Sequence, residues 1–274
     1  MVFWRAIAPL IVSLISVAVF AQERINYTRL ERDEIFRRLR KVTRGDAERL
    51  ATLRELFEES GCEDSNLVDQ PVEKSELPNL VCTLPGDTEL QIIIGAHFDA
   101  DPAGEGAVDN WTGAALLPSL YRSLSTRPRR HTLVFVAFAG GENRHLGSKH
   151  YATGLAKAEA REIRAMVNLE SLGLTRTLSW QFGGERELQV LVGEVGRYTM
   201  LPTDPLHPKQ LGRVDAELFA RRGIPSIVLH SVSKYNHEVR HSAEDTLDAV
   251  KRNEYYESYM LIASYLAYLD IELR

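Results

Sequence analysis

Residues 90–99 read LQIIIGAHFD and contain the pattern that decides the fold, a short apolar run that ends directly in polar side chains. Three more short apolar runs follow along the chain, and amphipathic stretches separate them. Apolar strands that alternate with helices are typical of a largely parallel sheet with helices on both faces. The sequence therefore predicts an α/β fold, a single three-layer domain with a mostly parallel mixed sheet. The predicted strands are 90–96, 132–138, 165–169 and 226–230, and the predicted helices are 111–125, 147–164, 214–222 and 246–269.

Upstream of these runs, residues 27–60 carry apolar side chains at helical spacing. An Arg-Gly-Asp triplet interrupts the spacing, so we expect two helices rather than one. Residues 61–89 are polar and contain proline, which is typical of a connecting stretch. We therefore expect a helical preface with its connecting segment over 22–79, which packs with residues 80–274 as one domain.

The chain contains two cysteines, Cys62 and Cys82. In an oxidising compartment an even number favours one disulfide. Such a bridge would close a loop of about 20 residues and contribute about 3 kcal/mol to stability. The alternative is two unrelated buried thiols. Two cysteines alone make a poor zinc site.

An apolar segment precedes the preface, because residues 6–20 read AIAPLIVSLISVAVF without a charge. Arg5 stands just before it, and small residues lie at positions −3 and −1 of a cut after Ala21. The run is shorter than the roughly 20 residues of a membrane span and fits a signal peptide over 1–21. We expect a periplasmic or extracellular protein without a stable membrane span once the leader is removed. A retained anchor or a buried helix is the alternative.

The composition excludes several classes of protein. Hydrophobic residues make up 44% of the 274 and charged residues 26%, which argues against intrinsic disorder. The formal charge of −5 lacks the basic excess typical of nucleic-acid binding, so we expect no nucleic acid as partner. The 18 glycines and 11 prolines follow no period, which excludes a collagen-like chain.

Each apolar run is followed by side chains that bind metals or protons, and ligands of open α/β sheets bind outside the carboxyl ends of the strands. We therefore expect two imidazoles and three carboxylates to converge on one edge of the sheet. Imidazole and carboxylate without thiolate suit a catalytic zinc site. Taken singly, such a histidine is more often structural, and such an aspartate is more often a helix cap. The five residues are His97, Asp109, Glu142, Glu170 and His241.

The whole pattern resembles the M28 family of zinc aminopeptidases, di-zinc exopeptidases of phosphorylase/hydrolase-like fold. The likeness covers roughly residues 80–270. Its motifs are GAHFD at 95–99, AVDNWTGAA at 107–115, GENRHLGSKHY at 141–151, VNLESLG at 167–173, RRGIPSIVL at 221–229 and HSAEDT at 241–246.

The resemblance implies two zinc ions per chain. His97, Asp109 and Glu170 would hold one ion. Asp109, Glu142 and His241 would hold the other, with Asp109 as the bridge. Asp99 matches the family's carboxylate behind the first histidine. Glu170 stands where the family usually has aspartate, a departure that a flexible edge can absorb.

A second departure concerns the general base, which the family supplies as the first of two adjacent glutamates. Alignment through the following Leu-Gly-Ser places Gly141 at the base and Glu142 at the zinc ligand. A shift by one residue would make Asn143 the ligand, and a neutral amide binds zinc poorly. Loss of a general base typically costs about 10²–10⁴ in rate. Glu105 or Glu244 could substitute.

The sequence thus predicts an exported zinc-dependent exopeptidase that acts on peptide or protein N-termini through metal-activated water. One alternative is a non-catalytic zinc-binding homologue that binds peptides or amino termini, supported by Gly141. Another is a glutaminyl-cyclase-like acyltransferase with one zinc, which the missing acid does not favour. His145 is interpreted as structural, and Asp215, near a polar position of the family, is given no role.

Overall fold

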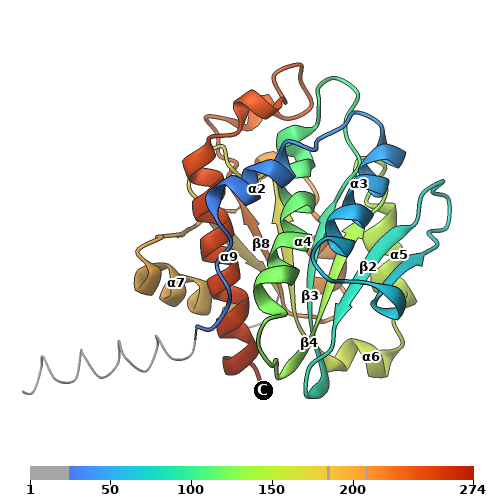
Figure 1. Cartoon of the computed structure of the whole chain (residues 1–274), viewed down its shortest axis with the longest axis vertical. Coiled ribbons are helices and arrows are strands. Elements are labelled where there is room, and N and C mark those ends of the chain that lie inside the picture. Colours follow the sequence, from blue (N-terminus) through green and yellow to red (C-terminus); the bar gives the residue numbers. More distant parts are fainter. Residues whose placement is uncertain (1–24, 184–185, 208) are drawn as a thin grey trace, which may run out of the picture.

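The structure, a computed structural model, describes residues 25–183, 186–207 and 209–274. Its centre is an eight-stranded sheet of order β1-β2-β4-β3-β5-β8-β6-β7 (Figure 1). The strands are β1 (Leu67–Gln70), β2 (Asn79–Leu84), β3 (Thr88–His97), β4 (His131–Phe138), β5 (Ile163–Glu170), β6 (Leu178–Phe182), β7 (Asp204–Pro205) and β8 (Ser226–His230). The helices are α2 (Arg32–Leu39), α3 (Asp46–Glu58), α4 (Thr112–Leu124), α5 (Leu146–Gly154), α6 (Lys157–Glu162), α7 (Glu187–Thr199), α8 (Asp215–Ala220) and α9 (Arg252–Glu272).

The four predicted strands form the parallel centre of the sheet, in the order β4-β3-β5-β8. Ile94 on β3 pairs with Phe135 on β4 and with Val167 on β5. The outer pairs β1–β2, β2–β4 and β6–β8 are antiparallel, so the sheet is mixed. The predicted fold class is confirmed.

Helices cover both faces of this sheet. Successive side chains of β3 point to opposite faces, and residues 92–97 are all buried, so each face needs a covering layer. Ala96 faces α4, where a Cβ on Gly113 would lie 3.1 Å from its methyl group. Gly95 faces the other layer, and a Cβ there would lie 2.3 Å from the ring of Phe138. That ring contacts Tyr151 of α5 and Phe219 of α8. A side chain at position 95 would separate these layers.

The stretch at 61–89, expected to be a connection, contains strands β1 and β2. The boundary at 79 therefore falls at the start of a sheet strand. Sequence reasoning also missed α7 and β6, and the last helix begins at Arg252 rather than at 246. The missed strands are short, and they lie outside the apolar parallel centre, where the strand signal is strongest.

The helical preface contacts the loops that follow β3. Arg49 of α3 is buried, and its guanidinium donates to the carbonyls of Phe98 at 3.0 Å and Gly106 at 3.3 Å. Trp111 donates its indole N–H to the carbonyl of Leu39 at 2.9 Å. These bonds satisfy buried polar groups on both sides and fix the preface against the edge of the sheet where β3 ends.

The predicted disulfide is present, with the Cα atoms of Cys62 and Cys82 6.3 Å apart. It joins the end of the preface to β2, across 20 positions of sequence. We expect its reduction to lower the free energy of unfolding by about 3 kcal/mol, because the bridge restricts the unfolded chain. Urea unfolding of the oxidised and reduced protein measures the difference. A Cys62→Ala/Cys82→Ala variant is the control, because it lacks both the bridge and reactive thiols. Equal urea midpoints for the oxidised protein, the reduced protein and this variant would contradict the expectation.

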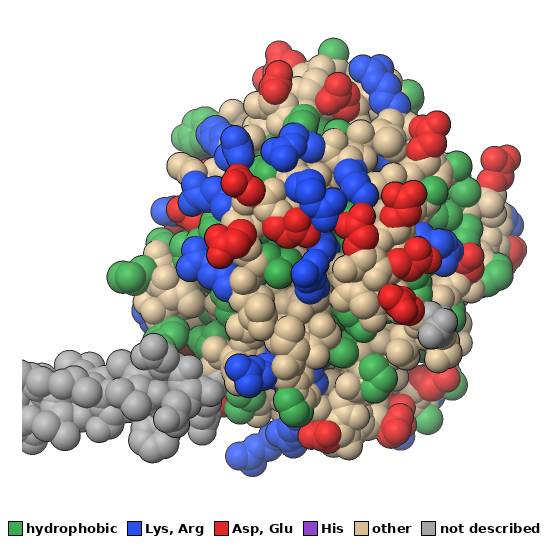
Figure 2. Space-filling view, viewed as in Figure 1, with side chains coloured by type: hydrophobic (Ala, Val, Ile, Leu, Met, Phe, Trp, Pro, Cys, Tyr) green, Lys and Arg blue, Asp and Glu red, His purple; other side chains and the backbone are tan. Residues whose placement is uncertain are grey.

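The leader predicted over 1–21 lies outside the described residues. Within the described ranges, no helix is both long enough and apolar enough to cross a membrane. On the face seen in Figure 2, acidic and basic side chains are interspersed.

Candidate metal centre

The carboxyl ends of the parallel strands bring the five predicted metal ligands to one edge of the sheet. His97 is the last residue of β3, and Glu170 is the last residue of β5. Glu142 follows β4, and His241 lies in the loop between β8 and α9. Asp109 lies in the turn Ala107–Trp111 that leads into α4.

Asp109 lies between the two histidines and directs one carboxylate oxygen to each. Its Oδ1 is 3.4 Å from Nε2 of His97, and its Oδ2 is 3.0 Å from Nε2 of His241. The side chain is fully buried. A carboxylate in this position can bridge two cations, because each of its oxygens faces a separate imidazole.

The other two carboxylates complete one cluster on each side of Asp109. Oε1 of Glu170 lies 3.6 Å from Nε2 of His97. Oε2 of Glu142 lies 3.2 Å from Nε2 of His241. Burial, followed by the charge of Asp109, raises the pKa of Glu142 to about 7. The three carboxylates thus share a small volume that favours a compensating positive charge.

Arg240, next to His241 in the chain, supplies part of that charge. Its Nη2 lies 2.8 Å from Oδ2 of Asp109. Burial opposes ionisation of Asp109, but Arg240 and the two imidazoles hold the pKa of that carboxyl well below its usual range. The predicted bridging carboxylate is therefore ionised, as metal binding requires.

Asp99 contacts both the first histidine and the loop after β4. Its Oδ1 lies 3.4 Å from Nδ1 of His97. Its two oxygens also accept the backbone N–H groups of Gly141 at 2.6 Å and Glu142 at 2.9 Å. Asp99 therefore positions an imidazole and a carboxylate at once, the kind of support that orients metal ligands.

The donor set fits a divalent metal such as zinc. Ligand atoms of His97, Asp109 and Glu170 lie within 4.8 Å of one another, and so do those of Glu142, His241 and Asp101. Oδ2 of Asp109 is buried without a hydrogen-bond partner of good geometry. Nitrogen and oxygen donors without sulfur suit catalytic zinc. Asp101 was not among the predicted ligands.

Gly141 is enclosed by His97. A Cβ at position 141 would lie 2.2 Å from Cγ and 2.4 Å from Cβ of His97. The family's glutamate therefore cannot be accommodated here without displacement of the imidazole. Glycine at this position is required by the close approach of the loop, which the hydrogen bonds to Asp99 maintain.

We expect Gly141→Ala to weaken zinc binding by about 10- to 100-fold, because the new methyl group displaces the imidazole of His97. Gly141→Glu is expected to give no gain in hydrolysis, for the same reason. Competition with a chromophoric chelator measures the affinity. Gly154→Ala is the matched control, since a Cβ at Gly154 meets nothing within 4 Å. Unchanged affinity in Gly141→Ala would contradict this packing.

A cavity of about 390 Å³ opens over the centre, and four of the five predicted ligands line it. Neither acid considered as a substitute base lies in this lining. Glu105 instead accepts the backbone N–H of Leu247 at 3.1 Å and lines a separate cavity, and Glu244 is exposed.

His145 lines the cavity beside Gly141. Its Nδ1 lies 3.1 Å from Oδ1 of Asp215, a fully buried carboxylate that also accepts the hydroxyl of Ser148. With Nδ1–H donating to Asp215, Nε2 remains as an acceptor. Burial lowers the pKa of His145, but the hydrogen bond and the charge of Asp215 outweigh it and raise that pKa above its ordinary value. Among the described lining residues that were not predicted as ligands, His145 is the one imidazole.

Sequence reasoning assigned no role to His145 or Asp215 and did not consider Arg240. The pair is 70 positions apart, and no local motif joins the two residues. The one sequence feature that could have indicated a role for Asp215 is its place near a polar position of the family before Gly-Ile-Pro. For Arg240, the one such feature is its position next to His241.

Known proteins resemble this chain in sequence. The family model described as peptidase family M28 matches residues 79–266. A probable leucine aminopeptidase of Trichophyton verrucosum (strain HKI 0517) is 28% identical over 218 residues, which cover 72% of this chain and 58% of that protein. The chain thus spans little more than half the length of this curated relative.

Solved structures share the fold. The LapA aminopeptidase of Legionella pneumophila superposes with a TM-score of 0.75 at 20% identity, over 94% of this chain and 75% of that chain. A glutaminyl cyclase of an Acidobacteriales bacterium superposes with a TM-score of 0.70 at 17% identity, over 88% of this chain and 95% of that chain. At these identities the likeness shows the fold alone.

Proposed function

Because the chain belongs to peptidase family M28, we propose that it is an exported zinc-dependent exopeptidase that removes N-terminal residues from peptides. The observation that carries this proposal is the placement of Asp109, whose two carboxylate oxygens face two separate imidazoles. The sequence relative with an aminopeptidase name supports the same reaction.

We propose that the centre holds two zinc ions. His97, Asp109 and Glu170 would hold one ion, and Asp109, Glu142 and His241 would hold the other. Bound zinc would supply Lewis acidity, which polarises a substrate carbonyl and acidifies water. Asp99 orients His97 and the loop that carries Glu142, so it acts as a positioning residue.

His145 is proposed as the proton acceptor in place of the absent glutamate. Nε2 would accept the proton lost by the attacking water and pass it to the leaving amine. Asp215 holds Nδ1 and so fixes the ring and its tautomer, an arrangement common to histidine bases. The enclosed Gly141 leaves no room for a side chain that could do this instead.

Export follows from the apolar leader and agrees with the disulfide between Cys62 and Cys82. The full chain, expressed in a bacterial host, is expected to appear in the periplasmic fraction with Gln22 as its first residue. N-terminal sequencing identifies the cut, and an intact Met1 in the membrane fraction would contradict it.

The reaction is tested on the purified chain after zinc loading. We expect two zinc ions per chain by elemental analysis and release of the N-terminal residue from a leucyl peptide, abolished by a chelator. The N-acetylated peptide is the matched control, because an exopeptidase of this kind requires a free amine. Cleavage of the acetylated peptide, or absence of bound zinc, would contradict the proposal.

A non-catalytic zinc-binding homologue is the second candidate, favoured by the enclosed Gly141. It predicts two bound zinc ions and peptide binding without release of a product. The same measurements distinguish the two functions. A glutaminyl-cyclase-like acyltransferase is supported by fold alone.

A further inference from the structure

Apart from the proposed metal ligands, the charged side chains among the described residues that line the cavity over the metal centre are all arginines. Arg144, Arg213 and Arg240 line it, and its described acids are the proposed ligands Glu142 and Glu170. Two zinc ions would carry four positive charges, and the three ligand carboxylates together with Asp99 and Asp101 would carry five negative ones. The three guanidinium groups therefore give the loaded cavity its net positive charge.

Arg240 is fixed at the innermost position. Its side chain is 9% exposed, with Nη2 2.8 Å from Asp109 and Nη1 3.3 Å from the carbonyl of Gln210. Nε is buried and has no hydrogen-bond partner. Nη1 and Nη2 each carry a second N–H, and Arg240 lines the cavity. A planar guanidinium in that place is suited to a carboxylate, which it can bind in a fork geometry.

The size of the cavity limits what can bind. About 390 Å³ lies near the lower end of the range for small-molecule sites. Arg144 and Arg213 are exposed and lie around the same opening. We therefore expect a carboxylate two to four bonds beyond the nitrogen of the scissile peptide bond to meet a guanidinium before it reaches open solvent.

We propose that the substrates are short peptides with a carboxylate next to the scissile bond, recognised by Arg240 together with Arg144 and Arg213. This inference rests on the proposed peptidase function of the same site. The carboxylate comes either from the C-terminus of a dipeptide or from an acidic side chain at its second residue.

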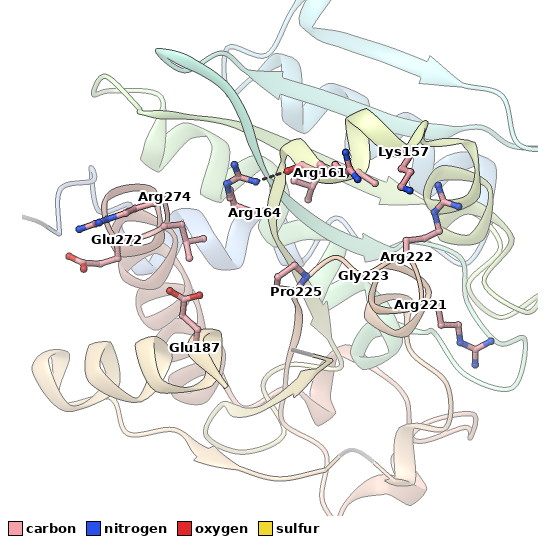
Figure 3. Close-up of a pocket in the computed structure, with 13 residues that line it drawn as sticks. Lys157, Arg161, Arg164, Glu187, Arg221, Arg222, Gly223, Pro225, Glu272 and Arg274 are labelled. Carbon is pink, nitrogen blue, oxygen red and sulfur yellow. Dashed lines mark hydrogen bonds between the residues drawn. The ribbon is translucent and has the colours of Figure 1, made fainter. Parts of the chain in front are cut away.

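A second cationic cavity provides the control for non-specific anion binding. It lies at the opposite edge of the sheet, before β5 and β8, and Arg161, Arg164 and Arg222 are among its lining residues (Figure 3). Arg164 donates to the carbonyl of Arg161, and Arg222 donates to the carbonyl of Leu155. Arg161 is exposed there, so Arg161→Gln removes one positive charge far from the metal centre.

The test compares kcat/KM for two matched pairs of substrates on the zinc-loaded protein. Leu-Gly against leucyl-glycinamide tests the terminal carboxylate, and Leu-Glu amide against Leu-Gln amide tests the side chain. We expect a preference of about tenfold or more for the carboxylate in at least one pair, the usual effect of a charge-assisted hydrogen bond. Arg213→Gln and Arg240→Gln should reduce that preference, while Arg161→Gln leaves it unchanged.

The zinc content of Arg240→Gln is measured as well, because this arginine contacts Asp109. Arg240→Lys keeps the charge without the fork, and it is expected to restore part of the preference. Equal kcat/KM within each pair, or a preference that survives both glutamine variants, overturns the inference.

A binding measurement distinguishes failure of this inference from failure of the proposed peptidase function. If no substrate is cleaved, the same dipeptides are tested for a rise in the melting temperature of the zinc-loaded protein. A rise with the carboxylate forms alone, lost in Arg213→Gln, supports the inference without hydrolysis. The absence of any difference between carboxylate and amide overturns it.

Discussion

Replacement of Asp109 by asparagine is expected to lower kcat/KM by about 10³-fold or more, because both metal positions share this carboxylate and the metal supplies several kcal/mol of transition-state stabilisation. The amide keeps the volume of the side chain but offers only one weak oxygen donor. We expect the zinc content to fall from two ions per chain to one or fewer.

A control variant and an unfolding measurement distinguish loss of metal from loss of the fold. Asp87→Asn, at an exposed position, is the control for the same chemical change. Thermal unfolding in excess chelator compares the metal-free proteins. A lower midpoint is expected for Asp109→Asn, since Arg240 loses its buried partner. Two retained zinc ions with nearly unchanged kcat/KM would show that Asp109 is not the bridge.

His145→Ala is expected to lower kcat by about 10²–10⁴-fold, the usual contribution of a general base. Zinc content and KM should change little, because the ring binds Asp215 and is not proposed as a ligand. Asp215→Asn should cause a smaller loss in kcat, since the ring remains but loses its orientation.

Chemical rescue distinguishes proton transfer from a structural role. Added imidazole is expected to restore part of the kcat of His145→Ala, because it can occupy the space of the missing ring. His150→Ala, in the helix α5 that begins directly after His145 but outside the cavity lining, is the control and should keep full activity. A kcat close to that of the unmodified chain, or no rescue together with a loss of zinc, would reject His145 as the proton acceptor.

The parallel centre of the sheet was predictable because each of its strands contains a short, largely apolar run. Residues 92–97 of β3 are buried without interruption, so the run reads as a strand from composition alone. The outer strands β1 and β2 were missed, since they mix polar with apolar side chains and pair antiparallel outside this centre.

The meeting of His97, Asp109, Glu142, Glu170 and His241 was also predictable. Each residue ends a parallel strand or lies in the segment after one, and the carboxyl ends of such strands meet at one edge of the sheet whatever the loops do. The contact between Asp99 and His97 was predictable from their separation of two residues in the sequence. These conclusions depend on topology, which the order of apolar and polar residues already contains.

The tertiary structure decided what surrounds those five residues. The enclosure of Gly141 by His97, the pairing of His145 with Asp215 and the contact of Arg240 with Asp109 each join different loops. Such contacts depend on loop paths and side-chain directions within a few tenths of an ångström. No spacing in a single sequence encodes them, because the residues meet only after the sheet has brought their loops together.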